Sequence, residues 1–198
     1  MVGGVTDDEA RFRALVVTNP AIAALIDRLP ELDLPDCWIT AGAVMQSVWN
    51  AIEEHPPAYG IRDYDVFYFD DDLSWEAEDR AIKRAAEAFR DVDANIEVRN
   101  QARVHLWFDE RNGTDGYPRL TSARHGIDMF LETPSMLGIH PTGGGAFDAY
   151  APRGYGDLFG FVHRRNPASV GPEAHYDEKS TRRKALYPRL TVVAWGAV

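Results

Sequence analysis

The sequence lacks the features that mark disulfide-rich, zinc-cluster and membrane proteins. Its 198 residues include one cysteine, Cys37. No intramolecular disulfide can therefore form, and no cysteine cluster can hold zinc. Residues 1–30 contain no basic start followed by a long apolar run, so we expect neither a signal peptide nor a membrane span. The expected compartment is the cytoplasm, with no membrane partner.

The sequence also lacks an excess of basic residues. The formal net charge is -10, which argues against a protein that grips a long nucleic acid through its phosphates. The charge is uneven, because residues 1–100 hold 21 acids and 9 bases, whereas residues 101–198 hold 10 acids and 12 bases. This asymmetry suits a metal on one side and an anionic ligand on the other, although two differently solvated surfaces explain it more simply.

Several common site patterns are missing as well. The six histidines are scattered and have no metal-site spacing. The pair Asp63 and Asp65 does not open a calcium loop, because Phe67 stands where a third polar ligand is needed. The sequence has no nucleophile-elbow pattern, so a serine hydrolase has no support.

The composition predicts one folded globular unit, and the order of the elements given below, with the family resemblance, predicts an α+β fold. Apolar residues make up 45% and charged residues 26%, as in ordinary globular proteins. We expect a single compact domain over residues 1–198, with possible sub-lobes at 1–116 (the core) and 117–198 (a smaller helix and hairpin lobe).

Hydrophobic periodicity and turn residues predict the elements of both halves. Helices are expected at 7–29 (one or two), 44–52, 75–89, 121–131, 155–167 and 177–190, strands at 37–40, 63–69 and 94–101, and a hairpin with a triple-glycine turn at 135–152.

Two acidic residues stand at the start of an otherwise apolar strand. In "DYDVFYF", Asp63 and Asp65 are two positions apart and so project from one face. Glu97 alternates with Ile96 and Val98 in "NIEVRNQ", where a buried lone charge would be costly. If the two strands are neighbours, three carboxylates converge. Such a trio can hold Mg²⁺ or Mn²⁺, since magnesium prefers oxygen ligands and substrate phosphates.

The turn "AGA" at residues 41–43 is a candidate phosphate site. Gly42 and Ala43 open a helix, where free backbone N–H groups attract anions and glycine permits a close approach. Small residues at a strand-to-helix turn are common, so packing alone also explains them.

Together these segments resemble the DNA polymerase β-like nucleotidyltransferase superfamily, which has a small-residue turn, an Asp-x-Asp strand and a third acid on a neighbouring strand. More narrowly, "WITAGAVMQSVWN", "RDYDVFYFD", "EVRNQARVHLWF", "APRGYGDLF" and "YPRL" resemble a bacterial nucleotidyltransferase-like family over residues 35–190. The resemblance implies a mixed sheet flanked by helices, with Mg²⁺ on Asp63, Asp65 and Glu97. It also implies attack on the α-phosphate of a nucleoside triphosphate, with loss of pyrophosphate.

The chain departs from the superfamily pattern in two places. Ala43 stands where a serine is usual, and the interval 44–62 is long. Ala43 removes a hydroxyl group from the phosphate site, and the long interval either lengthens a loop or closes the pocket, so both changes affect whether the site is active.

Further substrate contacts are expected after Glu97. If that strand continues, Gln101 and Arg103 share its face and can hold phosphate or base together with Asn100, although a structural ion pair is the favoured alternative for Arg103. The basic stretch 179–184 can reach a triphosphate or can form a solvated helix face.

Three functions remain open. The first is a nucleotidyltransferase that acts on a small molecule, a protein or an RNA end. The second is a noncatalytic nucleotide-binding module. The third is an Asp-x-Asp glycosyltransferase, which is disfavoured because "VFYF" continues the strand beyond the acid pair.

Overall fold

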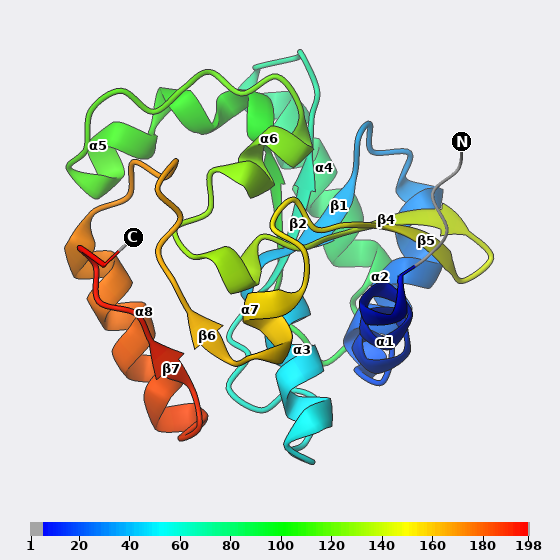
Figure 1. Cartoon of the computed structure of the whole chain (residues 1–198). Helices are drawn as coiled ribbons and strands as arrows, with labels where there is room; N and C mark the ends of the chain where they lie inside the picture. The colour runs from blue at the N-terminus through cyan, green and yellow to red at the C-terminus, as the bar shows by residue number, and fades with distance from the viewer. Residues whose placement is uncertain (1–5, 198) are drawn as a thin grey trace.

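A five-stranded mixed sheet forms the centre of the protein in the computed structural model, which describes residues 6–197 (Figure 1). The strand order is β3-β2-β1-β4-β5. Strands β2 and β3 are parallel, and the other neighbours are antiparallel. The strand bounds are β1 Trp38–Thr40, β2 Tyr64–Tyr68, β3 Ile96–Asn100, β4 Gly138–Gly143 and β5 Ala146–Tyr150. This sheet, flanked by helices, confirms the predicted α+β fold.

Strand β2 has two different faces. Tyr64, Val66 and Tyr68 are buried, whereas Asp65 and Phe67 are partly exposed on the other face. This is the alternation expected of a strand with one face on the core. Strand β2 therefore carries the acids on the side away from its most buried residues.

Helices α2 (Pro20–Arg28) and α4 (Trp75–Ala88) pack against strands of the sheet, and α1 (Asp7–Val16) packs on α3 (Ala41–Ile52). Their ends follow capping rules. The side chain of Asn19 accepts a hydrogen bond from Ala21 N at the start of α2, and that of Ser74 accepts one from Ala77 N at the start of α4. Helix α2 also begins with Pro20, whose fixed φ suits this position.

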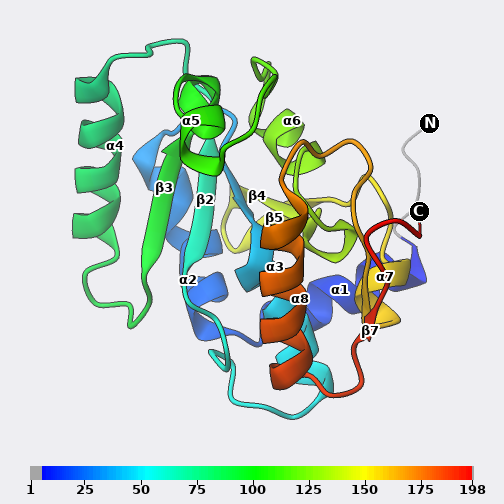
Figure 2. The same cartoon turned by 90° about the vertical axis from the view of Figure 1, so that its left-hand side faces the viewer.

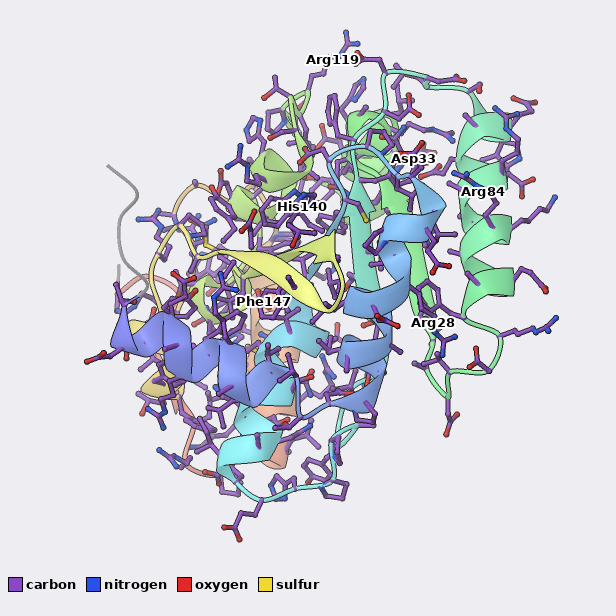
Figure 3. All side chains as sticks on the ribbon, turned by 90° about the vertical axis from the view of Figure 1, so that its right-hand side faces the viewer. Arg28, Asp33, Arg84, Arg119, His140 and Phe147 are labelled. Atoms are coloured by element: carbon purple, nitrogen blue, oxygen red, sulfur yellow. The ribbon has the colours of Figure 1, made fainter. Side chains whose placement is uncertain are left out.

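The hairpin of β4 and β5 extends the same sheet. Ile39 of β1 pairs with Ile139 of β4, so a segment from late in the chain lies beside the first strand. Figure 3 shows the hairpin, marked by His140 and Phe147, next to α1 and α2. Arg13 of α1 stacks on the Phe147 ring at 4.7 Å and donates a hydrogen bond to its carbonyl, which fixes the hairpin against α1.

Helix α8 (Glu173–Leu186) lies in front of α3 (Figure 2). An aromatic cluster beneath it fixes this placement. The Trp49 ring of α3 lies 5.0 Å from Phe161 and 5.1 Å from Tyr187, and Tyr187 donates a hydrogen bond to Asn50. Each buried aromatic side chain contributes about 2–3 kcal/mol to stability. These contacts hold helix α8 firmly against the core.

The remaining elements are short. They are the 3-10 helices η1 Leu29–Leu32, η2 Gln101–Leu106 and η3 Thr133–Ser135, the helices α5 Phe108–Asn112, α6 Ala123–Asp128 and α7 Gly156–Phe159, and the strands β6 Val162–His163 and β7 Thr191–Val192. Within residues 6–197, no helix has the length and apolar character needed to cross a bilayer.

One expected continuation does not occur, because strand β3 ends at Asn100. The Asn100 side chain accepts a hydrogen bond from Ala102 N and so caps the 3-10 helix η2. The placement of Gln101 and Arg103 on the strand face of Glu97 is therefore wrong.

Candidate active site

The three predicted acids lie at one place on the sheet. Asp65 of β2 is the register partner of Glu97 on the parallel strand β3, and Asp63 precedes Asp65 by two residues. Paired residues and residues two apart project from the same face of a sheet. The three carboxylates therefore share one face, as the sequence predicts.

The electrostatics around Asp65 are unfavourable for a structural carboxylate. Burial, then the neighbouring charges of Asp63 and Glu97, raise the pKa of Asp65 to about 7, against which Lys179 and Arg99 act weakly. Within residues 6–197, neither Asp63 nor Asp65 has a salt bridge. Glu97 does have one, at 3.1 Å from Arg99, but both side chains are more than a third exposed, so this pair is weak.

The start of helix α3 lies beside Asp65. Thr40 is the register partner of Asp65 on strand β1, and α3 begins at the next residue. Thr40 does not cap the helix, since its hydroxyl donates to the Leu137 carbonyl instead. Free N–H groups at an uncapped helix start form an anion site. Ala41 and Gly42 line the adjoining cavity.

The backbone of this turn is strained at Ala41, not at Gly42. Ala41 has a φ of 62°, in the left-handed region that costs a non-glycine residue roughly 1 kcal/mol. Ala43, the residue that replaces the usual serine, is buried in the main core and only 1% exposed. Its methyl group therefore faces the core, and Ala43 can contact a ligand through its backbone only.

A cavity of about 500 Å³ opens over this face. Gly42, Asp63 and Asp65 line it, whereas Glu97 is not among the lining residues. Five aromatic residues also line the cavity, and we name them the aromatic end: Phe67, which follows Asp65 on β2, Trp107, Phe108, Tyr117 and Phe130. A charged end and an aromatic end suit a ligand with an anionic tail and a planar ring.

The third side of the cavity is one face of α8. Lys179, Arg182 and Arg183 line it, together with His175 and Glu178 at helical spacing. We name Lys179 and Arg182 the basic wall. Burial, then the charges of Arg183 and Arg62, lower the pKa of Arg182, whereas Asp63 raises it. The basic wall thus faces the acids across the cavity.

Arg183 differs from the basic wall because it is buried and already paired. Its Nη1 lies 2.6 Å from Glu132 Oε1, and both side chains are at most 3% exposed. Lys179 Nζ lies 3.6 Å from the same Glu132 oxygen. Burial raises the pKa of Glu132. The charges of Arg183 and Lys179 outweigh this effect and hold the pKa far below its usual range. Glu132 is therefore an ionised carboxylate next to the cavity.

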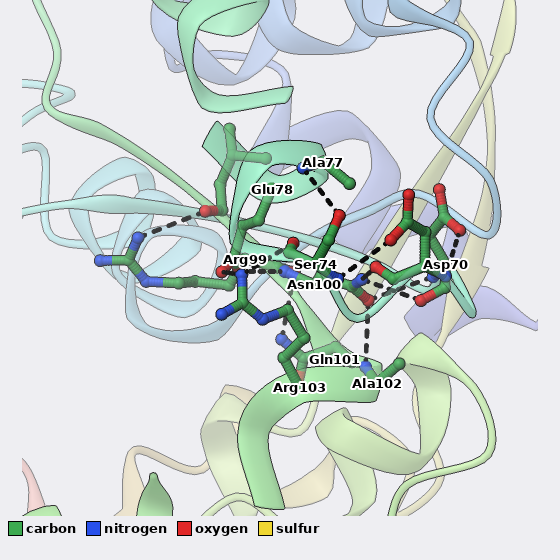
Figure 4. Close-up of polar contacts among 11 residues, drawn as sticks. Asp70, Ser74, Ala77, Glu78, Arg99, Asn100, Gln101, Ala102 and Arg103 are labelled. Atoms are coloured by element: carbon green, nitrogen blue, oxygen red, sulfur yellow. Dashed lines mark hydrogen bonds and ion pairs between the residues drawn. The ribbon is translucent and has the colours of Figure 1, made fainter. Parts of the chain in front are cut away.

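Two residues predicted to bind substrate serve the protein interior instead (Figure 4). Arg103 forms a buried ion pair with Glu78 at 2.6 Å. The Asn100 amide bonds to the Asp70 carbonyl, and Asn100 N donates to Glu78. Neither Asn100 nor Arg103 lines the cavity, whereas Gln101 does.

The sequence reasoning missed the aromatic end and Arg62. Trp107 lies between η2 and α5, Phe108 begins α5, and Tyr117 lies in the loop after it, where it stacks on Phe108 at 3.9 Å. Phe67 and Phe130 come from β2 and from the segment after α6. A signal was present, because Trp107, Phe108 and Tyr117 are large aromatic residues close together in a region of polar and glycine residues.

The donor set fits a magnesium ion that is shared with a substrate. Asp63 and Asp65 offer two unpaired carboxylates, and one or two carboxylates plus substrate phosphates is the usual magnesium environment. Among the described residues, no three His, Cys, Asp or Glu side chains already form a metal-binding cluster. Glu97 can join the aspartates once it leaves Arg99, a weak and exposed partner.

A mixed sheet with an Asp-x-Asp strand beside a helix start defines a nucleotidyltransferase-type domain. The chain matches a family model described as Nucleotidyltransferase over residues 27–192. The protein therefore belongs to this nucleotidyltransferase family, as its sequence resemblance predicts.

A solved structure has the same fold. It was determined by NMR and is described as a CCA-adding enzyme head domain, with a TM-score of 0.72 and 23% identity over 96% of this chain and 97% of that one. At this identity the likeness shows the fold alone. No protein with a curated description matches the chain.

Proposed function

We propose that the protein is a metal-dependent nucleotidyltransferase that transfers a nucleoside monophosphate from a nucleoside triphosphate to a hydroxyl group and releases pyrophosphate. The observation that carries this proposal is the pairing of Asp65 with Glu97, with Asp63 two residues away, at a cavity that also holds the start of α3. Three acids on one face are costly unless a cation is bound there.

The acids would hold Mg²⁺ or Mn²⁺ through Asp63 and Asp65, with Glu97 completing the site. When bound, the ion lowers the pKa of the attacking hydroxyl and neutralises the leaving pyrophosphate. Glu97 would orient the acceptor hydroxyl by accepting its hydrogen bond. Strand β2 keeps the two aspartates rigid, because Tyr64 and Val66 anchor it in the core.

The other sides of the cavity would bind the nucleotide. The uncapped start of α3 and the basic wall supply N–H groups and positive charge for the phosphates. The aromatic end supplies flat surfaces for the base, and stacking of this kind tolerates any base. Gln101 adds an amide near that end.

A noncatalytic nucleotide-binding module on the same fold is the second candidate. The ion pair of Glu97 with Arg99 favours it, because this pair occupies the third acid. The two functions differ in one measurable respect, since only the enzyme converts triphosphate to pyrophosphate.

The test is an incubation of the protein with each nucleoside triphosphate, Mg²⁺ or Mn²⁺ and a panel of acceptors, followed by detection of pyrophosphate and of labelled acceptor. The panel includes small alcohols, proteins and an RNA end, the last because of the CCA-adding relative. The Asp63→Asn, Asp65→Asn protein should be inactive, and Asp71→Asn, at an exposed aspartate after the strand, should be fully active. Pyrophosphate release by the double variant at the parent rate would refute the proposal, whereas nucleoside diphosphate formed from a sugar nucleotide would indicate a glycosyltransferase.

A further inference from the structure

The most unusual charge outside the acid site is the buried carboxylate of Glu132. It is 1% exposed, lies beside the cavity and holds Arg183 at 2.6 Å. Its second oxygen, Oε2, and the Arg183 Nε are buried without a hydrogen-bond partner among the described residues. A buried pair with unsatisfied atoms contributes little to stability compared with an apolar pair of the same size. This points to a role for the charge itself.

Glu132 cancels part of the positive charge on this side of the cavity. The positive charge of Arg183 is compensated by Glu132 at contact distance, so the pair is nearly neutral when seen from the cavity. Glu132 also lies 3.6 Å from Lys179 Nζ, which is 44% exposed and therefore open to a ligand. On the α8 side of the cavity, the cations left for an anion are therefore Lys179 and Arg182.

We infer that Glu132 sets how tightly the basic wall holds pyrophosphate, so that this product can leave. The inference rests on the proposed nucleotidyl transfer. In that reaction the acceptor oxygen forms a bond to the α-phosphorus and passes its proton to Glu97, which accepts its hydrogen bond. The bond from the α-phosphorus to the bridging oxygen breaks, and pyrophosphate departs with that electron pair. A phosphate held by Lys179 lies roughly 6 Å from Glu132, because Lys179 Nζ is 3.6 Å from the Glu132 oxygen and a hydrogen bond to the phosphate adds about 2.8 Å. Repulsion over this distance, partly shielded from water, changes an affinity by about tenfold.

The test is the affinity for inorganic pyrophosphate with Mg²⁺, measured by calorimetry on four proteins. They are the parent chain, Glu132→Gln, Arg183→Gln and the variant with both substitutions. Glu132→Gln, which removes the negative charge alone, should tighten pyrophosphate binding about tenfold. Removal of Arg183 alone should weaken it by a similar factor, because Glu132 is then uncompensated. The double variant should return close to the parent affinity.

The design remains informative if Glu132→Gln does not fold. The substitution of Glu132 is then compared in the Arg183→Gln background, where no buried charge is left behind, and should again tighten pyrophosphate binding about tenfold. Adenosine, which has no phosphate, is the control ligand, and its affinity should be the same in all four proteins. Unchanged or weaker pyrophosphate binding on removal of Glu132, in whichever background folds, overturns the inference. A parent chain that binds no pyrophosphate at all counts against the proposed function itself.

Discussion

Asp65 and Glu97 stand side by side on parallel strands, with like charges on one face of the sheet. Such a pair destabilises a fold, since opposed like charges cost free energy and the burial of one of them costs more. The proposed cation would offset this cost, and the pair therefore makes the stability of the protein a probe of the site.

Replacement of Asp65 by asparagine should stabilise the apoprotein while it abolishes transfer. The raised pKa of Asp65, about 7 against 3.8, means that its ionised form costs stability fully above pH 7. The cost shrinks as the pH falls below 7. We expect a gain of about 2 kcal/mol in the free energy of unfolding at pH 8 with EDTA, and a smaller gain at pH 5. Urea denaturation measures both.

Added Mg²⁺ should stabilise the parent chain more than Asp65→Asn. A ligand that binds only the folded state raises its stability. The melting temperature of the parent chain should therefore rise with Mg²⁺ concentration, whereas that of Asp65→Asn should rise much less. The assignment fails if Mg²⁺ shifts the two melting temperatures equally.

Replacement of Gly42 by alanine should impair nucleotide binding and leave the fold intact. A Cβ at Gly42 would lie 3.5 Å from Gln46 Oε1 and 3.7 Å from Arg183 Nη2, which are ordinary contacts. Because alanine favours helices, we expect the free energy of unfolding to stay equal or to rise by about 0.5–1 kcal/mol. The methyl group would obstruct the phosphates at the start of α3, so KM for the triphosphate should rise about tenfold. Gly156→Ala, at a helix start with nothing within 4 Å, is the matched control. A variant with the parent KM would show that phosphate does not approach Gly42.

Replacement of Arg103 by glutamine should destabilise the protein without changing catalysis. Arg103 and Glu78 are 13% and 9% exposed and lie 2.6 Å apart. Loss of one partner leaves a buried charge and costs about 3 kcal/mol. Thermal unfolding measures this cost, and kcat/KM per folded molecule should equal that of the parent. A selective rise in KM for the triphosphate would restore Arg103 as a substrate ligand.

The contribution of His163 to the stability should fall in mild acid. Burial, and then the charge of Arg183, lower the pKa of His163 from 6.5 to about 4, whereas Glu132 raises it. Above pH 6.5 the ring is neutral in both the folded and the unfolded chain, and it costs no stability. As the pH falls toward 4, the unfolded chain takes up a proton on His163 that the folded chain does not, and stability is lost. The parent chain should lose about 2 kcal/mol from this group between pH 7 and pH 5. Comparison with His163→Gln by urea denaturation isolates the effect from that of Asp65, which has the opposite sign. An equal pH dependence in both proteins would contradict the assignment.

Local patterns were enough to predict the sheet and the acids. The alternation in "DYDVFYF" identifies β2. Asp63 stands two residues before Asp65 and is therefore predicted on the same face. The end of β3 was not predictable from periodicity, because it depends on the Asn100 side chain, which turns to bond with the segment after β2.

Relations between distant segments could not be predicted. The choice between a phosphate contact and a solvated face for residues 179–184 depends on where α8 packs, and that depends on Trp49 and Tyr187. The structure splits the stretch, since Lys179 and Arg182 line the cavity and Lys184 is exposed. The strain at Ala41 could not be predicted either, because a sequence suggests that a positive φ falls on the adjoining glycine, Gly42.

The position of α8 late in the chain has a consequence for biosynthesis. A chain emerging from the ribosome displays Asp63, Asp65 and Glu97 long before Lys179 is made. The nascent protein thus has the acids without the basic wall, and β1 has not yet paired with its neighbour β4. Such a precursor should not capture triphosphate, so this activity would begin only when translation has passed the helix.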